Sequence, residues 1–385
     1  MPALDVTSTG AVRFVASVAE LDRAQWNACF KNEIENYDYH HGVERSGVGG
    51  FEFGWYVIEN AGHIICAAPA FTTRYDLATT AQGAVRTVLQ RIQPWVPGRL
   101  TLALSCLGSP VTERCQIGFS PELDRAARNA VLTQLIDHWR QHAASSGISL
   151  LGLKDLSQSD SDGFAQALAA SGFRMTASMP SASLKIDFDS EEAYLGKLSS
   201  ATRKDMRRKL KSRDNIRVER VCEAEHLLGE IMEMYQETRA RSDWAFESLD
   251  ASYFSNVVED MKGAAFFTLY WAGDKLVAAN LLIGANHRLL DKFFVMRGDE
   301  GRRHNLYFLS WFENIRYCLA HGLTVYESGQ AGYETKLRLG SELHRNWLGF
   351  HHGNRIVQGL LGMAAPLLAV DQPDDKGAGT GASKA

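Results

Sequence analysis

The sequence predicts a mixed α/β (α+β) protein of two related domains, each a mixed twisted sheet flanked by helices. A chain of 385 residues is longer than a single hydrophobic core usually supports, which favours two domains. An internal echo supports this, because Val57–Phe71 and Thr268–Leu282 align without gaps on Ala-Gly-x-x-apolar-apolar-Ala-Ala. In each half a long helix pattern also ends at Gly and leads directly into an apolar strand, which is the helix-to-strand step of an α/β unit.

The first half contains the simpler set of predicted elements. Its echoed segment predicts a hairpin that turns at Ala61-Gly62. A helix is expected over Ala127–Ala144, where Val131, Leu135 and Trp139 recur at i, i+4 and i+8. It precedes the strand ISLLGL at 148–153, and an insertion of roughly residues 72–110 separates it from the hairpin. The unit closes with SGFRM at 171–175, a Gly turn into another strand.

The second half repeats this order after an added helical stretch. It opens with SLKIDF at 183–188, which alternates with period two as a strand does. The remaining elements are a basic helix over 195–213, a strand at 216–221, helices near 224–241 and 251–262, the second hairpin, the strand LLDKFFVM at 289–296, a helix at 306–322 and the strand LTVYES. Tight hairpins mixed with helices indicate a mixed sheet.

The predicted boundaries follow from these patterns. We expect a tail at 1–10, domains at 11–178 and 179–353, an apolar helix at 354–370 and a second tail at 371–385. The fifteen residues Ile356–Val370 are nearly all apolar but too few to span a membrane. Packing over the second domain is the expected role of this helix, with peripheral membrane contact or a dimer interface as alternatives.

Composition excludes several classes of protein. Apolar residues at 45% and charged residues at 22% are typical of a globular chain, not of a disordered or collagenous one. The 41 basic and 45 acidic residues leave a formal net charge of -4, so the protein has no overall positive electrostatic field that would attract DNA. Without a leader pattern or a spanning apolar run, we expect a cytoplasmic protein. The six cysteines show no C-x-x-C spacing and predict reduced, buried thiols.

Three segments of the second half resemble a known family. They are Ser-x-x-x-Arg-Lys-x-x-Arg-Arg at 199–208, AGDKLVAANLL at 272–282 and ESGQAGYETKLRLG at 327–340, which contains Gly329, Gly332 and Lys336. In these residues and their order the chain resembles the FemAB-like and CelD/BioF-like branch of the GNAT acyltransferase superfamily. The resemblance covers roughly residues 25–352. It implies two tandem GNAT-like domains, the first degenerate, and an N-acyltransferase that moves an acyl group from acyl-CoA to an amine by direct attack in a ternary complex.

The candidate catalytic residues lie near the end of the last predicted α/β strand. Glu327 is a candidate base at that strand end, and the resemblance implies that Tyr333 protonates the leaving group. Lys336 is expected to bind a carboxylate or phosphate, or else to pair with a neighbouring Glu on the surface. Asp291 interrupts an apolar strand together with Lys292, so it is a second candidate base unless the two charges merely accommodate each other.

Two basic segments are candidates for holding the phosphates of the donor. Arg203, Arg207 and Arg208 lie on the basic helix, whose alternative role is a solvated surface. The loop RGDEGRRHN, at the place where GNAT enzymes bind the coenzyme A pyrophosphate, supplies Arg297, Gly298, Gly301, Arg302 and Arg303. Acyl-CoA is thus expected as a co-substrate, with no tightly bound cofactor.

The acceptor side of the site is less defined. His41 and Glu44, in NYDYHHGVERSG, and Gln330 are expected to contact a small-molecule or cell-wall-precursor amine. No metal is expected, because the i, i+4 histidines of HWRQH lack the Glu of a zinc protease motif. Two alternatives remain: a FemAB-like transferase that uses aminoacyl-tRNA on a cell-wall precursor, or a non-catalytic module that binds phosphate or a lipid precursor.

Overall fold

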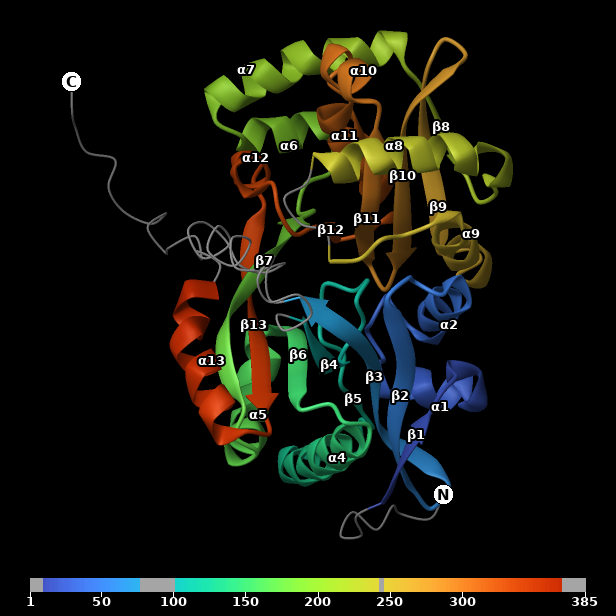
Figure 1. Cartoon of the computed structure of the whole chain (residues 1–385). Helices are drawn as coiled ribbons and strands as arrows, with labels where there is room; N and C mark the ends of the chain where they lie inside the picture. Colours follow the sequence, from blue (N-terminus) through green and yellow to red (C-terminus); the bar gives the residue numbers. More distant parts are fainter. Residues whose placement is uncertain (1–9, 77–100, 242–245, 369–385) are drawn as a thin grey trace, which may run out of the picture.

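The computed structural model describes residues 10–76, 101–241 and 246–368. Within them the strands form one 13-stranded mixed sheet, ordered β1-β2-β3-β4-β6-β13-β7-β12-β11-β10-β9-β8, with β5 beside β3. The sheet extends through two halves that lie one above the other (Figure 1). The prediction of a mixed α/β fold is therefore confirmed.

The first half contains β1 to β6 and the helices between them. The elements are β1 (Ala11–Val15), α1 (Arg23–Cys29), α2 (Tyr37–Ser46), β2 (Phe51–Asn60), β3 (His63–Asp76), β4 (Thr101–Leu107), β5 (Gly118–Phe119), α4 (Arg125–Ser145), β6 (Leu150–Ser157) and α5 (Gln158–Ala170). Helix α4 buries Val131, Leu135 and Trp139, the stripe that predicted it. The middle of the predicted insertion, 77–100, lies outside the described residues.

The second half contains most of the remaining elements. They are β7 (Arg174–Lys185), α6 (Glu191–Lys197), α7 (Ser200–Lys209), β8 (Arg217–Val221), α8 (Leu228–Ala240), α9 (Ala251–Asp260), β9 (Ala265–Ala272), β10 (Lys275–Ala285), β11 (Arg288–Met296), α10 (Gly298–Arg303), α11 (Leu306–His321), β12 (Val325–Gly329), α12 (Tyr333–Arg338), β13 (Glu342–His352) and α13 (Arg355–Leu368). The two echoed hairpins are confirmed as β2-β3 and β9-β10, with positive φ at Ala61, Gly62 and Gly273.

The basic helix differs from its prediction. One helix was expected over 195–213, but the chain forms α6, then α7, and then a 3-10 turn at Leu210–Asn215. The break lies at Ser199, whose hydroxyl accepts a hydrogen bond from the backbone N–H of Thr202 and caps α7. A serine cap starts a new helix more favourably than it continues an old one.

Strand β7 joins the two halves. The predicted strands at SGFRM and SLKIDF belong to this single strand. It pairs with β13 from Arg174 to Ser183 and with β12 from Ala182 to Lys185. Strand β13 also pairs with β6, so the last strand of the chain returns to the first half. A division into 11–178 and 179–353 does not capture this double crossing.

Helix α13 packs on β13, a strand of the predicted second domain, at the level of the first half of the sheet (Figure 1). It lies against β7 and β13 (Figure 1), and the Thr176 hydroxyl donates a 3.2 Å hydrogen bond to the carbonyl of Ala365. Its outer face leaves Ile356, Leu360 and Met363 75%, 56% and 69% exposed. Among the helices of the described residues, none is long and apolar enough to cross a membrane.

All six cysteines have free thiols. Cys29, Cys66, Cys106, Cys115 and Cys318 are buried, and Cys222 is exposed. The prediction that the thiols are buried is thus wrong for Cys222, which follows β8 at the edge of the sheet, where no further strand covers it.

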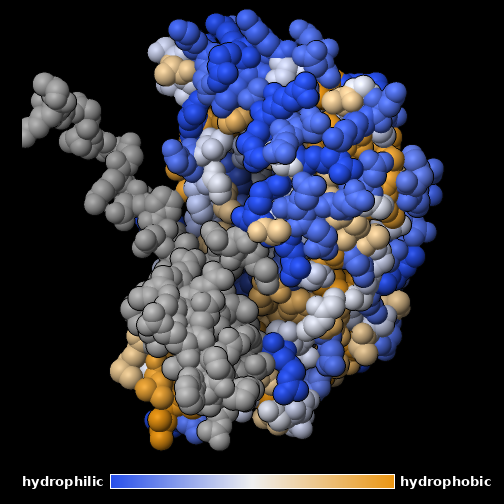
Figure 2. All heavy atoms as spheres, turned by 45° about the horizontal axis from the view of Figure 1, so that its top comes forward, coloured by the Kyte–Doolittle hydropathy of each residue, from blue (hydrophilic) through white to orange (hydrophobic). Residues whose placement is uncertain are grey.

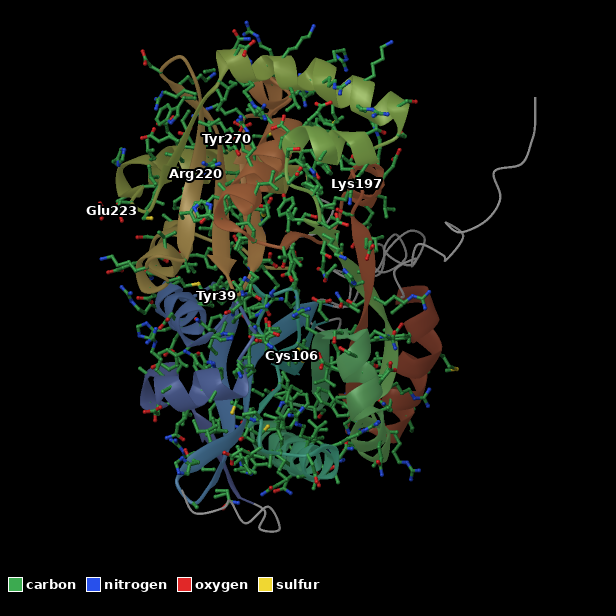
Figure 3. All side chains as sticks on the ribbon, turned by 180° about the vertical axis from the view of Figure 1, so that it is seen from behind. Tyr39, Cys106, Lys197, Arg220, Glu223 and Tyr270 are labelled. Carbon is green, nitrogen blue, oxygen red and sulfur yellow. The ribbon has the colours of Figure 1, made fainter. Side chains whose placement is uncertain are left out.

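Buried polar contacts hold the halves together. The Lys292 ammonium on β11 contacts the Glu35 carboxylate at 2.5 Å, and the two side chains are only 5% and 7% exposed. Lys292 also donates to the carbonyl of Val111 at 2.7 Å. Tyr39, at the junction in Figure 3, shares a 2.9 Å hydrogen bond between hydroxyls with Tyr253 of α9. Burial lowers the pKa of Lys292, but Glu35 and the neighbouring Tyr253 and Glu113 together raise it above its ordinary value, so the ammonium stays charged.

We expect Lys292→Met to destabilise the protein by about 3 kcal/mol, because it leaves the Glu35 carboxylate buried without its partner. The measurement is the free energy of unfolding from urea titration. Adding Glu35→Gln should restore part of the loss, since the double variant buries no unpaired charge. The matched control is Arg23→Met, which removes an exposed ion pair with Asp38 and should change stability little. Equal effects of the two single variants would contradict the assignment.

Candidate functional site

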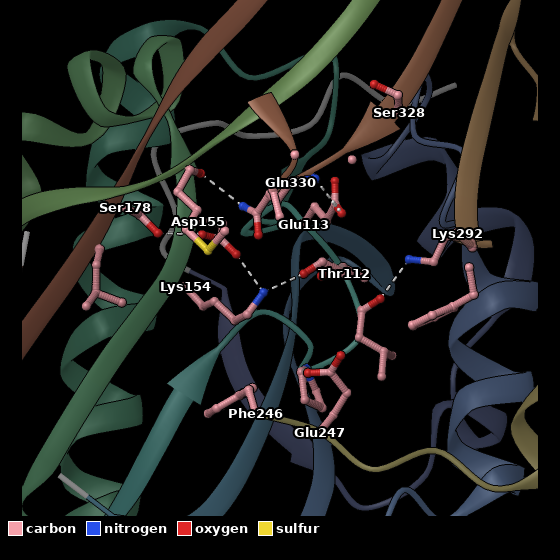
Figure 4. A pocket seen from close by; sticks show the side chains of 18 of the residues that line it. Thr112, Glu113, Lys154, Asp155, Ser178, Phe246, Glu247, Lys292, Ser328 and Gln330 are labelled. Atoms are coloured by element: carbon pink, nitrogen blue, oxygen red, sulfur yellow. Dashed lines mark hydrogen bonds and ion pairs between the residues drawn. The ribbon is translucent and has the colours of Figure 1, made fainter. Parts of the chain in front are cut away.

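A cavity of about 770 Å³ lies between the two halves. Its walls come from β3, β4, β6, β7, β11, β12, β13 and α13, together with the loops after β4 and before α9 (Figure 4). This size is typical of a small-molecule site. Residues of both halves therefore line the cavity.

The cavity opens where two parallel strands part. The pairing of β11 with β12 ends at Leu290 and Glu327, although β11 continues to Met296. Residues of both strands beyond this point line the cavity, among them Asp291, Phe294 and Ser328. Beyond Leu290, the edge of β11 on the β12 side thus faces the cavity, and among the described residues no strand is paired with it on that side.

A β-bulge lies at the same point of β11. On the neighbouring strand β10, Leu281 pairs with Phe293 and Leu282 pairs with Asp291, which leaves Lys292 as the extra residue. In a regular strand Asp291 and Lys292 would point to opposite faces. Both line the cavity here, but Asp291 bonds to Asn314 of α11 and Lys292 bonds to Glu35 of the first half, so each charge has its partners on a different element.

Asp291 is held by two hydrogen bonds. Its Oδ2 atom accepts from the Tyr326 hydroxyl at 2.7 Å and from the Asn314 amide at 3.0 Å. Burial raises the pKa of Asp291 to about 6, more than these hydrogen bonds lower it. A carboxyl group with such a pKa can exchange a proton near neutral pH.

Glu113 is a second carboxyl group in the cavity. It lies in the loop between β4 and β5, and its Oε1 accepts a 3.1 Å hydrogen bond from the backbone N–H of Gln330. Burial raises its pKa. Gly329 has a φ of 78°, and a Cβ atom there would lie 2.7 Å from Oε1 of Glu113. This close approach requires glycine.

Lys336 organises the turn that receives Glu113. Its ammonium donates to the carbonyls of Ser328, Gly329 and Gln330, at 2.5, 2.9 and 3.2 Å. Three acceptors use all three of its N–H groups. Burial lowers the pKa of Lys336. Its contacts are those of a residue that positions the turn.

Lys154 and Asp155 form a buried ion pair at the end of β6. The Lys154 ammonium contacts Asp155 Oδ2 and the Thr112 carbonyl, both at 2.6 Å, and the Ser178 hydroxyl donates to Asp155 Oδ1 at 2.6 Å (Figure 4). Asp155 has a φ of 58°, which is unfavourable for a residue with a side chain. Such backbone strain is often found at functional sites.

Of the predicted catalytic and substrate residues, the structure brings Asp291, Lys336 and Gln330 to the cavity. Glu327 and Tyr333 lie close by but have other partners. Glu327 contacts Arg288 at 2.8 Å, and the Tyr333 hydroxyl donates to the Pro180 carbonyl at 2.9 Å.

The other predicted substrate residues lie on α2, away from the cavity wall. His41 contacts Asp260 of α9 at 2.9 Å, and Glu44 accepts from the backbone N–H of Val18. These contacts fix α2 against its neighbours. They do not bring either side chain to the cavity.

The predicted phosphate-binding arginines on α7 are also distant from the cavity. Helix α7 lies at the outer end of the second half (Figure 1), over a mainly hydrophilic surface (Figure 2). Arg207 contacts Glu192, and Arg208 contacts Asp205 at 2.8 Å. Arg203 lies on the same helix. The cavity-lining residues do not include these three arginines.

Acidic side chains occupy the predicted phosphate loop. Arg297 contacts Glu230 and Glu233 at 3.3 Å, and the backbone N–H of Gly298 donates to the Glu237 carboxylate at 3.1 Å. The loop itself forms the short helix α10, in which Arg302 contacts Asp299, Arg303 contacts Glu300 and Gly301 packs on Met296. A phosphate group would have to displace Glu237 to reach Gly298.

Sequence reasoning missed Glu113, Lys154 and Asp155. A usable signal existed, because Lys154 and Asp155 directly follow the apolar strand ISLLGL, and Glu113 follows another apolar strand. Polar residues just beyond the carboxyl ends of α/β strands are frequent ligand contacts. The rule holds for the first half as well as for the second.

Comparison with known proteins identifies relatives of this architecture. The chain matches the FemAB-like family, described as peptidoglycan biosynthesis and recognition, over residues 105–357. FemX superposes with a TM-score of 0.61 at 14% identity, covering 91% of this chain and 99% of FemX. A tandem GNAT protein from the clavulanic acid biosynthesis pathway superposes with a TM-score of 0.50 at 15% identity, covering 89% and 99% of the two chains. At these identities the likeness establishes the fold.

A curated relative also matches in sequence. It is a putative 8-amino-7-oxononanoate synthase 2 of Mycobacterium tuberculosis, 23% identical over 322 residues. The match covers 79% of this chain but only 40% of the relative. The family match, by contrast, covers well over half of the chain, and the chain therefore belongs to the FemAB-like family, with the tandem GNAT fold that its sequence predicted.

Proposed function

We propose that this protein transfers an acyl group from acyl-CoA to an amine in the cavity between its halves. Membership of the FemAB-like family and the tandem GNAT fold support a transferase of acyl or aminoacyl groups. The observation that carries the proposal is a pair of carboxyl groups with raised pKa, Asp291 and Glu113. Both line one cavity to which the two units contribute residues. General bases are most effective when their pKa lies near the working pH.

Asp291 is the proposed base. It takes a proton from the ammonium group of the acceptor, and the free amine then attacks the carbonyl carbon of the donor. A C–N bond forms and the C–S bond of the thioester breaks. The attacking nitrogen then loses its extra proton and the departing thiolate gains one, which leaves a neutral amide and a free thiol. Because Tyr326 and Asn314 hold one carboxylate oxygen of Asp291, the orientation of this group is fixed before the substrate arrives.

Two tyrosines are candidates to protonate the thiolate. Tyr333 remains the candidate expected from the family, although its hydroxyl donates to the Pro180 carbonyl and would have to exchange that partner. Tyr307 lines the cavity directly. Burial raises the pKa of both hydroxyls, so each carries its proton at neutral pH.

The parted strands favour a donor with an extended amide arm. Beyond Leu290, β11 is paired with β10 on one side and faces the cavity on the other. An extended amide chain, such as the pantetheine of coenzyme A, can add to such an edge through backbone hydrogen bonds. Arg241 also lines the cavity, next to Gly298, where its guanidinium can meet a phosphate group.

A second candidate is transfer from aminoacyl-tRNA to a cell-wall precursor. The contact of Glu237 with Gly298 favours it, because this carboxylate occupies the N–H group that a coenzyme A pyrophosphate needs. The exposed arginines of α7 are available to a large polyanion outside the cavity.

We expect Asp291→Asn to lower kcat/KM for acyl transfer by about 100-fold or more, because the amide accepts no proton. The control is Asp187→Asn, which removes an exposed carboxylate paired with Lys197 and should retain full turnover. Circular dichroism should show both variants folded. Full activity of Asp291→Asn would exclude the assigned base.

The pH profile gives an independent check on Asp291. A base must be ionised to act, and the pKa of Asp291 is raised to about 6. The kcat/KM of the wild type should therefore rise as the pH increases from 5 to 7, with its half-point at about 6. The residual activity of Asp291→Asn should not show this rise with pH. If the variant shows the same rise as the wild type, the rise belongs to the ionisation of another group.

The donor can be identified by thermal shift. Coenzyme A should raise Tm if it binds the folded chain, because a ligand of the native state stabilises it. Arg241→Ala should reduce this shift, while Arg217→Ala, on the outer edge strand β8, should leave it unchanged. No shift with coenzyme A, together with turnover of aminoacyl-tRNA, would replace the first donor with the second.

A further inference from the structure

The cavity has an apolar wall that the proposed acyl transfer does not by itself require. Phe71, Leu104, Cys106 and Leu150 form one small hydrophobic cluster on β3, β4 and β6. Phe246 and Leu361 pack against this cluster, and all six side chains also line the cavity. They come from five separate segments of the chain.

Strand alternation creates this wall. On β4, Ser105 bonds to Trp139 of α4 at 2.8 Å on one face of the sheet, so Leu104 and Cys106 project from the other. On β6, Gly152 lies between them, and a Cβ atom there would approach Leu104 Cδ1 to 3.2 Å and Cys106 Sγ to 3.3 Å. The glycine keeps the wall open between its neighbours.

Helix α13 and strand β13 extend the wall on the side away from Asp291. Leu361 and Ala365 of α13 line the cavity, as do Leu348 and Phe350 of β13. The preceding residue of α13, Leu360, lies about 100° around the helix and is exposed. Two adjacent leucines of one helix therefore face different environments, the cavity and the surface.

The three lysines of the cavity have partners of their own. Lys154 contacts Asp155, Lys292 contacts Glu35, and Lys336 contacts three carbonyls. The apolar wall therefore offers little to a polar ligand, whose groups lose their bonds to water there. A hydrocarbon chain, in contrast, gains from each methylene that it buries.

We propose that this apolar wall binds an unbranched hydrocarbon chain of roughly ten or more carbons, since shorter chains leave most of a cavity of this size in contact with water. Two molecules can carry the chain: a fatty acyl donor, whose acyl group is transferred, or an acceptor with a lipid tail. Only this choice of carrier rests on the proposed function. The binding of the chain does not.

Binding can be measured on the full-length protein without turnover. The probe is 11-dansylaminoundecanoic acid, whose fluorescence rises in an apolar site, displaced by hexanoic, decanoic and tetradecanoic acids below their aggregation limits. Displacement should strengthen by at least about tenfold from decanoic to tetradecanoic acid, because every buried methylene adds affinity. Displacement that does not depend on chain length would overturn the proposal.

Two neighbouring leucines supply the matched variants. Leu361→Trp fills the cavity side of α13 and should weaken probe binding about tenfold, while Leu360→Trp enlarges the exposed side and should stay within about twofold of the wild type. Leu104→Gln tests the opposite wall with little change in volume and should also weaken binding. If Leu361→Trp does not fold, Leu104→Gln decides. Equal binding by a folded wall variant and Leu360→Trp would indicate adsorption to the surface.

Turnover then identifies the carrier of the chain. If kcat/KM rises with the acyl length of the CoA donor, the wall binds the transferred group, and if it rises only with the tail of an amine acceptor, the wall binds the acceptor. Chain binding without any acyl transfer would refute the proposed function and leave the site intact. Transfer that depends on Asp291 without chain binding would refute the site alone.

Discussion

The architecture depends on the backbone pairing of β7, which continues through both halves of the sheet. Its first part pairs with β13 and its last residues with β12, and β13 pairs in turn with β6. Ladder hydrogen bonds in the middle of a sheet are stiff, because each strand is held on both sides. The two units therefore cannot hinge freely, and a cavity at their junction keeps its shape when empty. Lys292 and Glu35 add a buried ionic contact across the same junction.

The two units contribute differently to that cavity. In the first, β4 ends where its pairing with β6 ends, at Leu107 and Leu153. In the second, β11 continues beyond its last pair with β12 and carries a bulge there. The second unit thus provides an open strand edge and Asp291, whereas the first provides Glu113 and four side chains of the apolar wall, Phe71, Leu104, Cys106 and Leu150. Both units therefore contribute to the site, and they contribute different groups.

Several charged side chains lie close together and buried in this site. Burial of a charged group is costly unless partners compensate for it. The lysines of the cavity have such partners, and they are structural in consequence. The two carboxyl groups are compensated less, so burial raises the pKa of Asp291 and Glu113. Groups that respond to pH near neutrality are those that can move protons in a reaction. In the proposed mechanism the lysines hold the geometry and Asp291 supplies the chemistry.

The sequence by itself determined the local elements and three residues of the cavity, Asp291, Lys336 and Gln330. Helix α4 and the two hairpins follow from periodicity and turn residues, which act between near neighbours. Asp291 could be selected from the sequence because a charged residue within an apolar strand must be paired or exposed. Tertiary structure alone decided that Glu113 contacts the backbone of Gln330, 217 residues away. It also decided that Glu237 occupies the N–H of Gly298, and that β13 returns to the first half. Such contacts depend on long-range pairing, which leaves no periodic signal in the segments that it joins.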